Sequence, residues 1–220
     1  MQQLILDLAP FNPQTFENFI PGKNAEVLHA LSALCAGREN QLVYLWGAGG
    51  SGKSHLLNAA VEATLRRGGG AQHFEGAVFY DLTHCDLVAA DAVEALDEDA
   101  QSALFLLYNE RREAGRATLV AGAMPPALLP LRDDLRSRLA WGLVYEVHVL
   151  SDEEKASALD AHAKARGFRV SSEVVHQLLA RGPRDLPTLF ATLDALDRYS
   201  LETKRAINVN TLRELMRRSA

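Results

Sequence analysis

The 220-residue chain has few cysteines, no membrane-length apolar run and no excess of basic charge. Cys35 and Cys85 are too few for a framework of disulfides, which favours a reducing, cytoplasmic location. The longest apolar stretch without charge, residues 117–131, is shorter than the roughly 20 residues that cross a bilayer, and it contains prolines. The N-terminus has no basic segment followed by an apolar one, so the sequence predicts neither a secretory signal nor a membrane helix.

The charge balance is acidic, with 23 Lys and Arg against 28 Asp and Glu and a net charge of -5. A surface of this sign repels nucleic acid, so strong direct DNA binding is not expected. Hydrophobic residues make up 48% of the chain, which is ordinary for a folded soluble protein and excludes wholesale disorder.

Short apolar runs of strand length alternate with helical patterns through the first 150 residues. This alternation is typical of a parallel sheet covered by helices, so the expected fold class is α/β. The expected strands are 41–46, 85–90, 117–121 and 143–149, and the expected helices are 25–36, 53–67 and 97–113.

One further strand is ambiguous between Ala71–Phe74 and Ala77–Leu82. A parallel neighbour needs a crossover of about a dozen residues, and the second option leaves too few residues before the next strand. Either the earlier segment is the strand, or Ala77–Leu82 pairs antiparallel or lies outside the sheet.

The chain changes character near residue 150. Ser151 and Glu154 form a capping box, and only helical patterns follow, at 152–166, 172–181, 185–203 and 209–218. We therefore expect an extended arm over 1–12, an α/β core over 13–150 and an all-α lid domain over 151–220.

A phosphate-binding motif, G-x-x-x-x-G-K-[ST], occupies residues 47–54 between an expected strand and an expected helix. Glycines let successive N–H groups point at phosphate oxygens, and the helix N-terminus adds its positive dipole end. The lysine charge meets the β- and γ-phosphates, and the serine hydroxyl ligates Mg²⁺. The sequence thus predicts ADP or ATP with Mg²⁺, bound by Gly47, Gly49, Gly50, Ser51, Gly52, Lys53 and Ser54.

A carboxylate on the magnesium side should end a neighbouring buried strand, and Asp91 is the best candidate, with Asp81 as its rival. The next residue is Ala92, whose methyl group cannot orient or deprotonate water. Glu94 and Glu98 follow, but neither has the expected position. We therefore predict nucleotide binding without efficient intrinsic hydrolysis.

These motifs together resemble the DnaA-related AAA+ family, and within it the regulatory inactivator (Hda) family, over nearly the whole chain. The resemblance implies an AAA+ P-loop core followed by a helical lid. It also implies that Phe16 and Phe19 lie over the adenine, that His55 belongs to the nucleotide-binding residues, and that Arg184 senses the phosphates from the lid. The matching segments are 16–19 with Gly22 and Asn24, 44–47, 54–57, 107–109, 135–142, 184–186 and 188–194.

Residues 135–142 are similar to the family's arginine-finger segment, which implies that Arg138 acts in trans on ATP held by DnaA. A guanidinium is always charged and fits phosphate oxygens with two hydrogen bonds. Arg136 is the nearby alternative, and the plain structural interpretation of both residues is a solvated basic helix face.

The N-terminal segment Gln3-Leu4-Ile5-Leu6-Asp7-Leu8 is similar to the peptide by which the Hda family docks on the DNA polymerase III sliding clamp. In an extended segment Leu4, Leu6 and Leu8 point to one side, with Gln3 at the rim. The alternative is an edge strand that covers the protein's own core.

The resemblance as a whole implies a negative regulator of replication initiation whose partners are DnaA and the sliding clamp, with homo-oligomers left open. The alternative is a self-hydrolysing AAA+ ATPase or helicase-loader-like protein; a small-molecule kinase and a DNA-binding initiator explain fewer motifs. The chain departs from the family pattern at Ala92, at the apolar residues 122–124, in the shortened 75–84 region and at Pro187, which interrupts the segment after Arg184.

Overall fold

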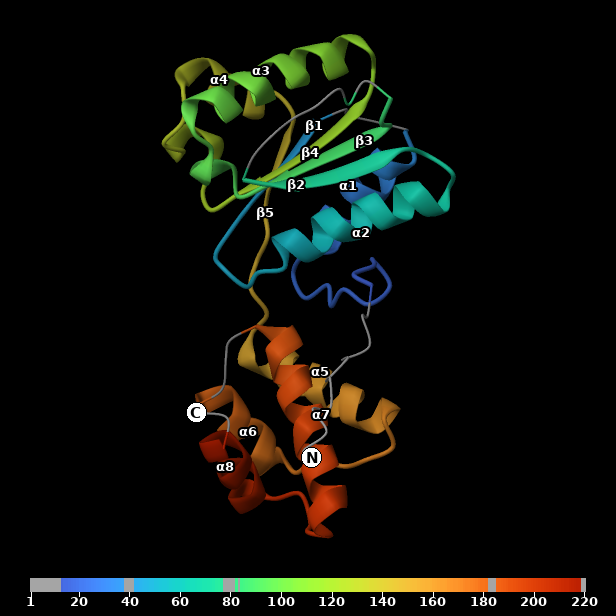
Figure 1. Cartoon of the computed structure of the whole chain (residues 1–220), viewed down its shortest axis with the longest axis vertical. Coiled ribbons are helices and arrows are strands. Elements are labelled where there is room, and N and C mark those ends of the chain that lie inside the picture. Colours follow the sequence, from blue (N-terminus) through green and yellow to red (C-terminus); the bar gives the residue numbers. More distant parts are fainter. Residues whose placement is uncertain (1–12, 38–41, 77–81, 83, 182–184, 219–220) are drawn as a thin grey trace, which may run out of the picture. The chain divides into compact units, whose positions relative to one another are not determined.

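The computed structural model describes residues 13–37, 42–76, 82, 84–181 and 185–218, which form two compact units (Figure 1). The first unit contains residues 25–47 and 52–147 together with the described residues up to Phe19. The second contains the chain from His148 onward, with Ile20–Asn24 and the loop segment Ala48–Ser51.

A five-stranded parallel sheet in the order β2-β3-β4-β1-β5 forms the centre of the first unit. In register, Trp46 pairs with Gly122, and Glu75 pairs with Asp91. The carboxyl ends of these strands therefore meet at one edge, and the α/β expectation is confirmed. The strands are β1 (Leu42–Trp46), β2 (Ala71–Glu75), β3 (Leu87–Asp91), β4 (Ala117–Gly122) and β5 (Leu143–Glu146).

The ambiguous strand is the earlier one, because β2 begins at Ala71 and pairs parallel with β3. Most of the alternative, residues 77–81, lies outside the described residues, as does the rival carboxylate Asp81. The predicted strand 143–149 was too long. Val147 still donates its N–H to Trp46 O at 2.7 Å, but β1 ends there and the phosphate-binding loop begins, so β5 has no further partner.

Helices cover both faces of the sheet (Figure 1). Alternate strand residues point to opposite faces, and each face has its own apolar core. Helices α1 (Ala25–Cys35) and α2 (Lys53–Arg66) pack on the face of Val43, Ala89 and Leu119; α3 (Glu98–Glu113) and α4 (Asp133–Leu139) pack on the face of Tyr44, Val88 and Val120.

The second unit is all helical and has a separate core that includes Leu159, Leu178, Leu193 and Leu212. The capping box between Ser151 and Glu154 is present. Pro187, which departs from the family pattern, lies in the first turn of a helix, where its fixed φ is tolerated. The helices are α5 (Asp152–Ala165), α6 (Ser172–Arg181), α7 (Leu186–Thr203) and α8 (Val209–Arg218).

Asn24 connects two backbone segments that are distant in the sequence. Its Nδ2 donates to His148 O at 2.9 Å, and its Oδ1 accepts from His148 N at 2.8 Å. The residue is only 1% exposed, so these bonds satisfy a buried amide.

Among the described residues, no helix combines the length and the hydropathy needed to cross a membrane.

Candidate nucleotide site and arginine segment

The phosphate-binding loop connects the end of β1 to the start of α2. Gly50 and Gly52 have φ values of 75° and 100°, which side-chain-bearing residues rarely adopt. Gly52 also has no room for a side chain, since a Cβ there would lie 2.7 Å from the ring of Phe19. These glycines give the loop the backbone shape that the motif predicts.

The chain brings Lys53, Ser54 and Asp91 together at the carboxyl edge of the sheet. Lys53 Nζ donates to Gly47 O at 2.7 Å, and the Ser54 hydroxyl donates to Asp91 Oδ2 at 2.5 Å. Asp91 is the last residue of β3 and is buried. Burial lowers the pKa of Lys53, while the carboxylates of Asp91 and Glu94 oppose that shift.

The loop residues fit a phosphate chain with a divalent cation. The hydroxyl oxygen of Ser51 is buried without a hydrogen-bond partner among the described residues, and a Cβ at Gly49 or Gly50 would meet open space. Lys53 would bind the phosphates, and Ser54 and Asp91 would hold Mg²⁺, which takes its other ligands from phosphate and water. Among the described residues there is no cluster of three His, Cys, Asp or Glu side chains that could hold a metal ion.

The aromatic residues expected near the base lie beside the loop. Phe19 is buried, and its ring lies directly against the backbone of Gly52. The Phe19 ring also meets the His55 ring edge to face, with 5.3 Å between the ring centroids. His55 Nε2 lies 2.9 Å from Thr15 O, and burial lowers the pKa of this imidazole. Phe16 is half-buried against the same core. Arg184 and the N-terminal peptide, with Gln3, Leu4, Leu6 and Leu8, fall outside the described residues.

Glu94 is a feature that sequence reasoning did not place. Ala92 has a left-handed φ of 51°, and the chain turns there into a short helix, η1 (Val93–Ala95). Through this turn Glu94 Oε2 accepts a hydrogen bond from Ala123 N at 3.1 Å, just past the end of β4. The carboxylate thus occupies the strand end where 122–124 lack a polar side chain, and its charge partly opposes the lowering of the Lys53 pKa by burial.

The arginine segment, residues 132–142, contains α4 and the turn that follows it. Two of its arginines pair with acids of the same segment: Arg132 with Asp134 at 2.7 Å, and Arg136 with Asp133. Arg136 is therefore held in a local ion pair, as expected of a solvated helix face.

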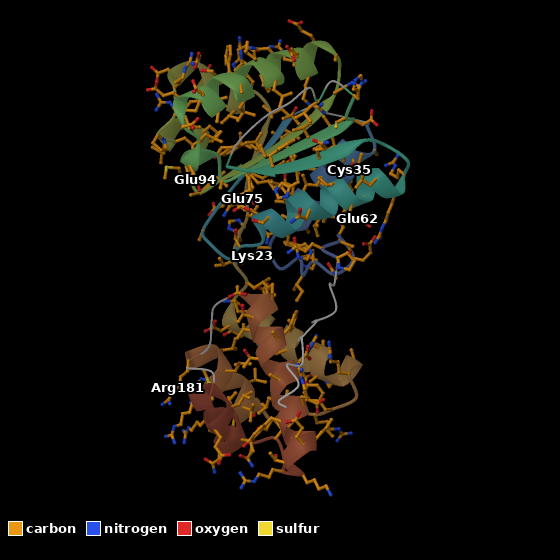
Figure 2. The ribbon with its side chains drawn as sticks, in the orientation of Figure 1. Lys23, Cys35, Glu62, Glu75, Glu94 and Arg181 are labelled. Atoms are coloured by element: carbon orange, nitrogen blue, oxygen red, sulfur yellow. The ribbon has the colours of Figure 1, made fainter. Side chains whose placement is uncertain are left out.

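Arg138 has a different environment from its neighbours. Its guanidinium carbon lies 3.9 Å from the ring centroid of Trp141 and 5.5 Å from that of Phe105. Its Nε is buried without a hydrogen-bond partner among the described residues. Arg112 lies over the same indole, at 4.7 Å. Figure 2 shows the side chains around both the loop and the helical layer that carries α4.

Comparison with known proteins shows which domain and which fold the chain resembles. Residues 152–216 match the family model described as "Hda, lid domain". Domain III of the replication initiation protein DnaA from Thermotoga maritima superposes with a TM-score of 0.78 at 21% identity, over 94% of this chain and 98% of that one. The helical unit is therefore similar to an Hda lid domain, and the fold as a whole is similar to that of DnaA.

Two further structures agree with this DnaA-related fold. AMPPCP-bound DnaA from Aquifex aeolicus has a TM-score of 0.74 at 22% identity, over 84% of this chain and 66% of that one, so the chain spans about two thirds of its length. The Thermotoga maritima RuvB Holliday junction branch migration motor has a TM-score of 0.70 at 18% identity, over 93% of this chain and 72% of that one.

Proposed function

We propose that this AAA+ protein is a nucleotide-bound negative regulator of chromosome replication initiation. It would stimulate hydrolysis of ATP bound by DnaA, with Arg138 acting in trans as an arginine finger. Residues 3–8 would tether it to the DNA polymerase III sliding clamp. The Hda lid match and the DnaA-like fold support the choice of partner.

The observation that carries the proposal is the state of Arg138. Its guanidinium contacts aromatic faces, while the acids of the segment are paired with Arg132 and Arg136. A guanidinium without a carboxylate partner keeps its charge available for an incoming phosphate. Such a group neutralises charge that develops in the phosphoryl-transfer transition state, an effect worth roughly 10³- to 10⁵-fold in rate.

The nucleotide bound by this chain itself would stabilise the fold rather than be hydrolysed. Lys53, Ser54 and Asp91 fit ADP or ATP with Mg²⁺. The residue after Asp91, however, is Ala92, and a methyl group cannot polarise the attacking water. Bound nucleotide would therefore stabilise the AAA+ core from which Arg138 acts.

The decisive experiment measures hydrolysis of DnaA-bound ATP with clamp-loaded DNA, comparing wild type with Arg138→Ala and Arg136→Ala. Arg138→Ala should lower the stimulated rate by about 10³-fold while nucleotide and clamp binding stay unchanged. Arg136→Ala is the matched control, because it removes an arginine from the same helix that is already paired, and it should keep most of the stimulation. Normal stimulation by Arg138→Ala would refute the role.

The tether has its own test. Capture of the protein on immobilised clamp should be lost when Leu6 and Leu8 are both changed to alanine. Changing Ile5 to alanine is the control, because in an extended peptide it faces away from the other two. Equal capture of all three proteins would show that the arm has another role.

Intrinsic ATP hydrolysis is a second candidate function, favoured by the placement of Glu94. This carboxylate lies beside the end of β4 and within the electrostatic reach of Lys53, so it could orient water in place of Ala92. Turnover of ATP by the isolated chain, abolished by Glu94→Gln, would support this alternative. Absence of turnover in the nucleotide-bound wild type would exclude it.

A further inference from the structure

We propose that Trp141 is the positioning residue of the arginine finger, holding the Arg138 guanidinium on its indole face so that its terminal Nη–H groups are left for a phosphate. This inference rests on the proposed function of Arg138. It adds a specific role for a neighbouring residue that itself touches neither nucleotide nor water.

The backbone after α4 places the ring beneath the guanidinium. Trp141 N donates to Arg138 O at 3.1 Å, so the helix ends in a tight turn that brings residues three apart onto one side. The next residue fixes the ring's position on the core. A Cβ at Gly142 would lie only 2.4 Å from Leu42 O, so only glycine lets the chain run this close to β1.

The local acids cannot compete for Arg138. Asp133 and Asp134 are paired with Arg136 and Arg132. Aromatic faces attract a guanidinium through the ring quadrupole, and the cation stacks flat upon them. A carboxylate would occupy the N–H donors that a phosphate needs, whereas a stacked ring occupies none of them. Nε itself is buried, so the terminal Nη–H groups are the donors left for a phosphate.

Two residues of α3 complete this arrangement. Phe105 limits the guanidinium on a second side, at 5.5 Å from its ring centroid. Arg112 lies over the same indole and adds positive charge there without offering Arg138 an acceptor. Trp141 is itself 53% exposed, so its size is not explained by burial in the core. An exposed indole that contacts two guanidiniums is best explained by their positioning.

Three substitutions separate stacking from packing. Trp141→Leu keeps an apolar side chain and removes the π face, Trp141→Phe keeps a smaller π face, and Leu65→Ala removes an exposed apolar side chain from α2 on the opposite face of the sheet. In the clamp-loaded DnaA assay, Trp141→Leu should lower the maximal stimulated rate about 2- to 30-fold, the range of one cation–π contact. Trp141→Phe should restore most of the rate, and Leu65→Ala should not change it.

A measurement on the isolated, nucleotide-bound protein tests the stacking directly. The Nε–H resonance of Arg138, assigned with Arg138→Lys, should be shifted by the indole ring current in wild type. The shift should vanish in Trp141→Leu and persist, reduced, in Trp141→Phe. Thermal unfolding should stay within a few degrees for all variants, because the indole is half exposed.

The outcomes distinguish this inference from the proposed function. If Arg138→Ala abolishes stimulation but Trp141→Leu leaves both the maximal rate and the resonance unchanged, positioning by Trp141 is wrong and the finger stands. If Trp141→Leu raises only the concentration needed for half-maximal stimulation, Trp141 contacts DnaA and positioning is again wrong. If Arg138→Ala has no effect while the resonance shifts as expected, the proposed function fails although the stacking is real.

Discussion

The nucleotide site and the arginine segment handle their charged groups in opposite ways. At the nucleotide site, Lys53 donates to Gly47 and Ser54 donates to Asp91, so the functional groups are bonded to one another. In the arginine segment, the Arg138 guanidinium lies over two aromatic rings, and its Nε has no acceptor among the described residues. In the first site the described groups already bond to one another, whereas under the proposed function the second would be completed by a phosphate from a partner.

The largest effect that sharpens this comparison is expected at Lys53. Lys53→Ala removes the charge that faces the phosphates and should weaken ADP binding by about 100-fold or more, because each charge-assisted bond contributes about 1.5–3 kcal/mol. Titration calorimetry measures this. Lys164→Ala, which removes an exposed lysine of α5, is the control. The Arg138 resonance should not move; a shift would show that the two regions are coupled.

Giving Arg138 a carboxylate partner should remove the difference between the arginine segment and the nucleotide site. Trp141→Glu replaces the ring with a carboxylate three residues away, within reach of an i,i+3 ion pair. The stimulated hydrolysis of DnaA-bound ATP should fall by about 50-fold, more than in Trp141→Leu, because the stacking is lost and the donors are occupied. Trp141→Gln, similar in shape but uncharged, should behave like Trp141→Leu. Equal rates for the Glu and Gln variants would contradict this explanation.

A smaller effect is expected at Asp91. Asp91→Asn keeps the shape of the side chain beside Ser54 but removes the charge that Mg²⁺ would sense. The Mg²⁺ concentration needed for tight ADP binding should rise about 10-fold, the value of one hydrogen bond to a charged group. Binding without Mg²⁺ should be unaffected. If Mg²⁺ dependence is unchanged, another residue supplies the magnesium-side ligand.

The smallest effect concerns pH. Burial lowers the pKa of His55 below its ordinary value of 6.5. Below that value the unfolded chain therefore binds more protons at this site than the folded chain does, and the free energy of unfolding falls as pH decreases. Denaturant unfolding between pH 7 and pH 5 should show this slope, reduced in His55→Gln, which can still donate to Thr15 O. A steeper pH dependence of the free energy of unfolding in His55→Gln would contradict its attribution to His55.

The sequence predicts those features of this protein that depend on residues close to one another along the chain. The glycines and lysine of the loop, the capping box at Ser151 and the buried strand ending at Asp91 are all local patterns, and the structure confirms them. The length of β5 was not predictable from its own residues. Its end is set by the end of β1, whose paired residues lie 100 positions earlier in the chain, so only the paired sheet reveals it.

Two site features depend on contacts that the sequence does not show. Glu94 reaches Ala123 because β3 and β4 are neighbours and because Ala92 turns the chain with a left-handed φ. The sequence gives only a weak indication that Arg138 and Trp141 interact, namely their spacing of three residues at the end of a helix. The partners that make it informative, Phe105 and the paired acids, come from packing between α3 and α4.

The bonds from Asn24 to His148 have a consequence for protein engineering. They hold the two ends of the 25–147 segment within hydrogen-bonding distance, although 124 residues separate the bonded pair. A segment whose ends meet can be excised or circularly permuted without stretching the chain. Joining Ala25 to Val147 through a few glycines, with new termini in the exposed turn at Gly115, should give a permuted sheet domain that is open to study without its helical companion.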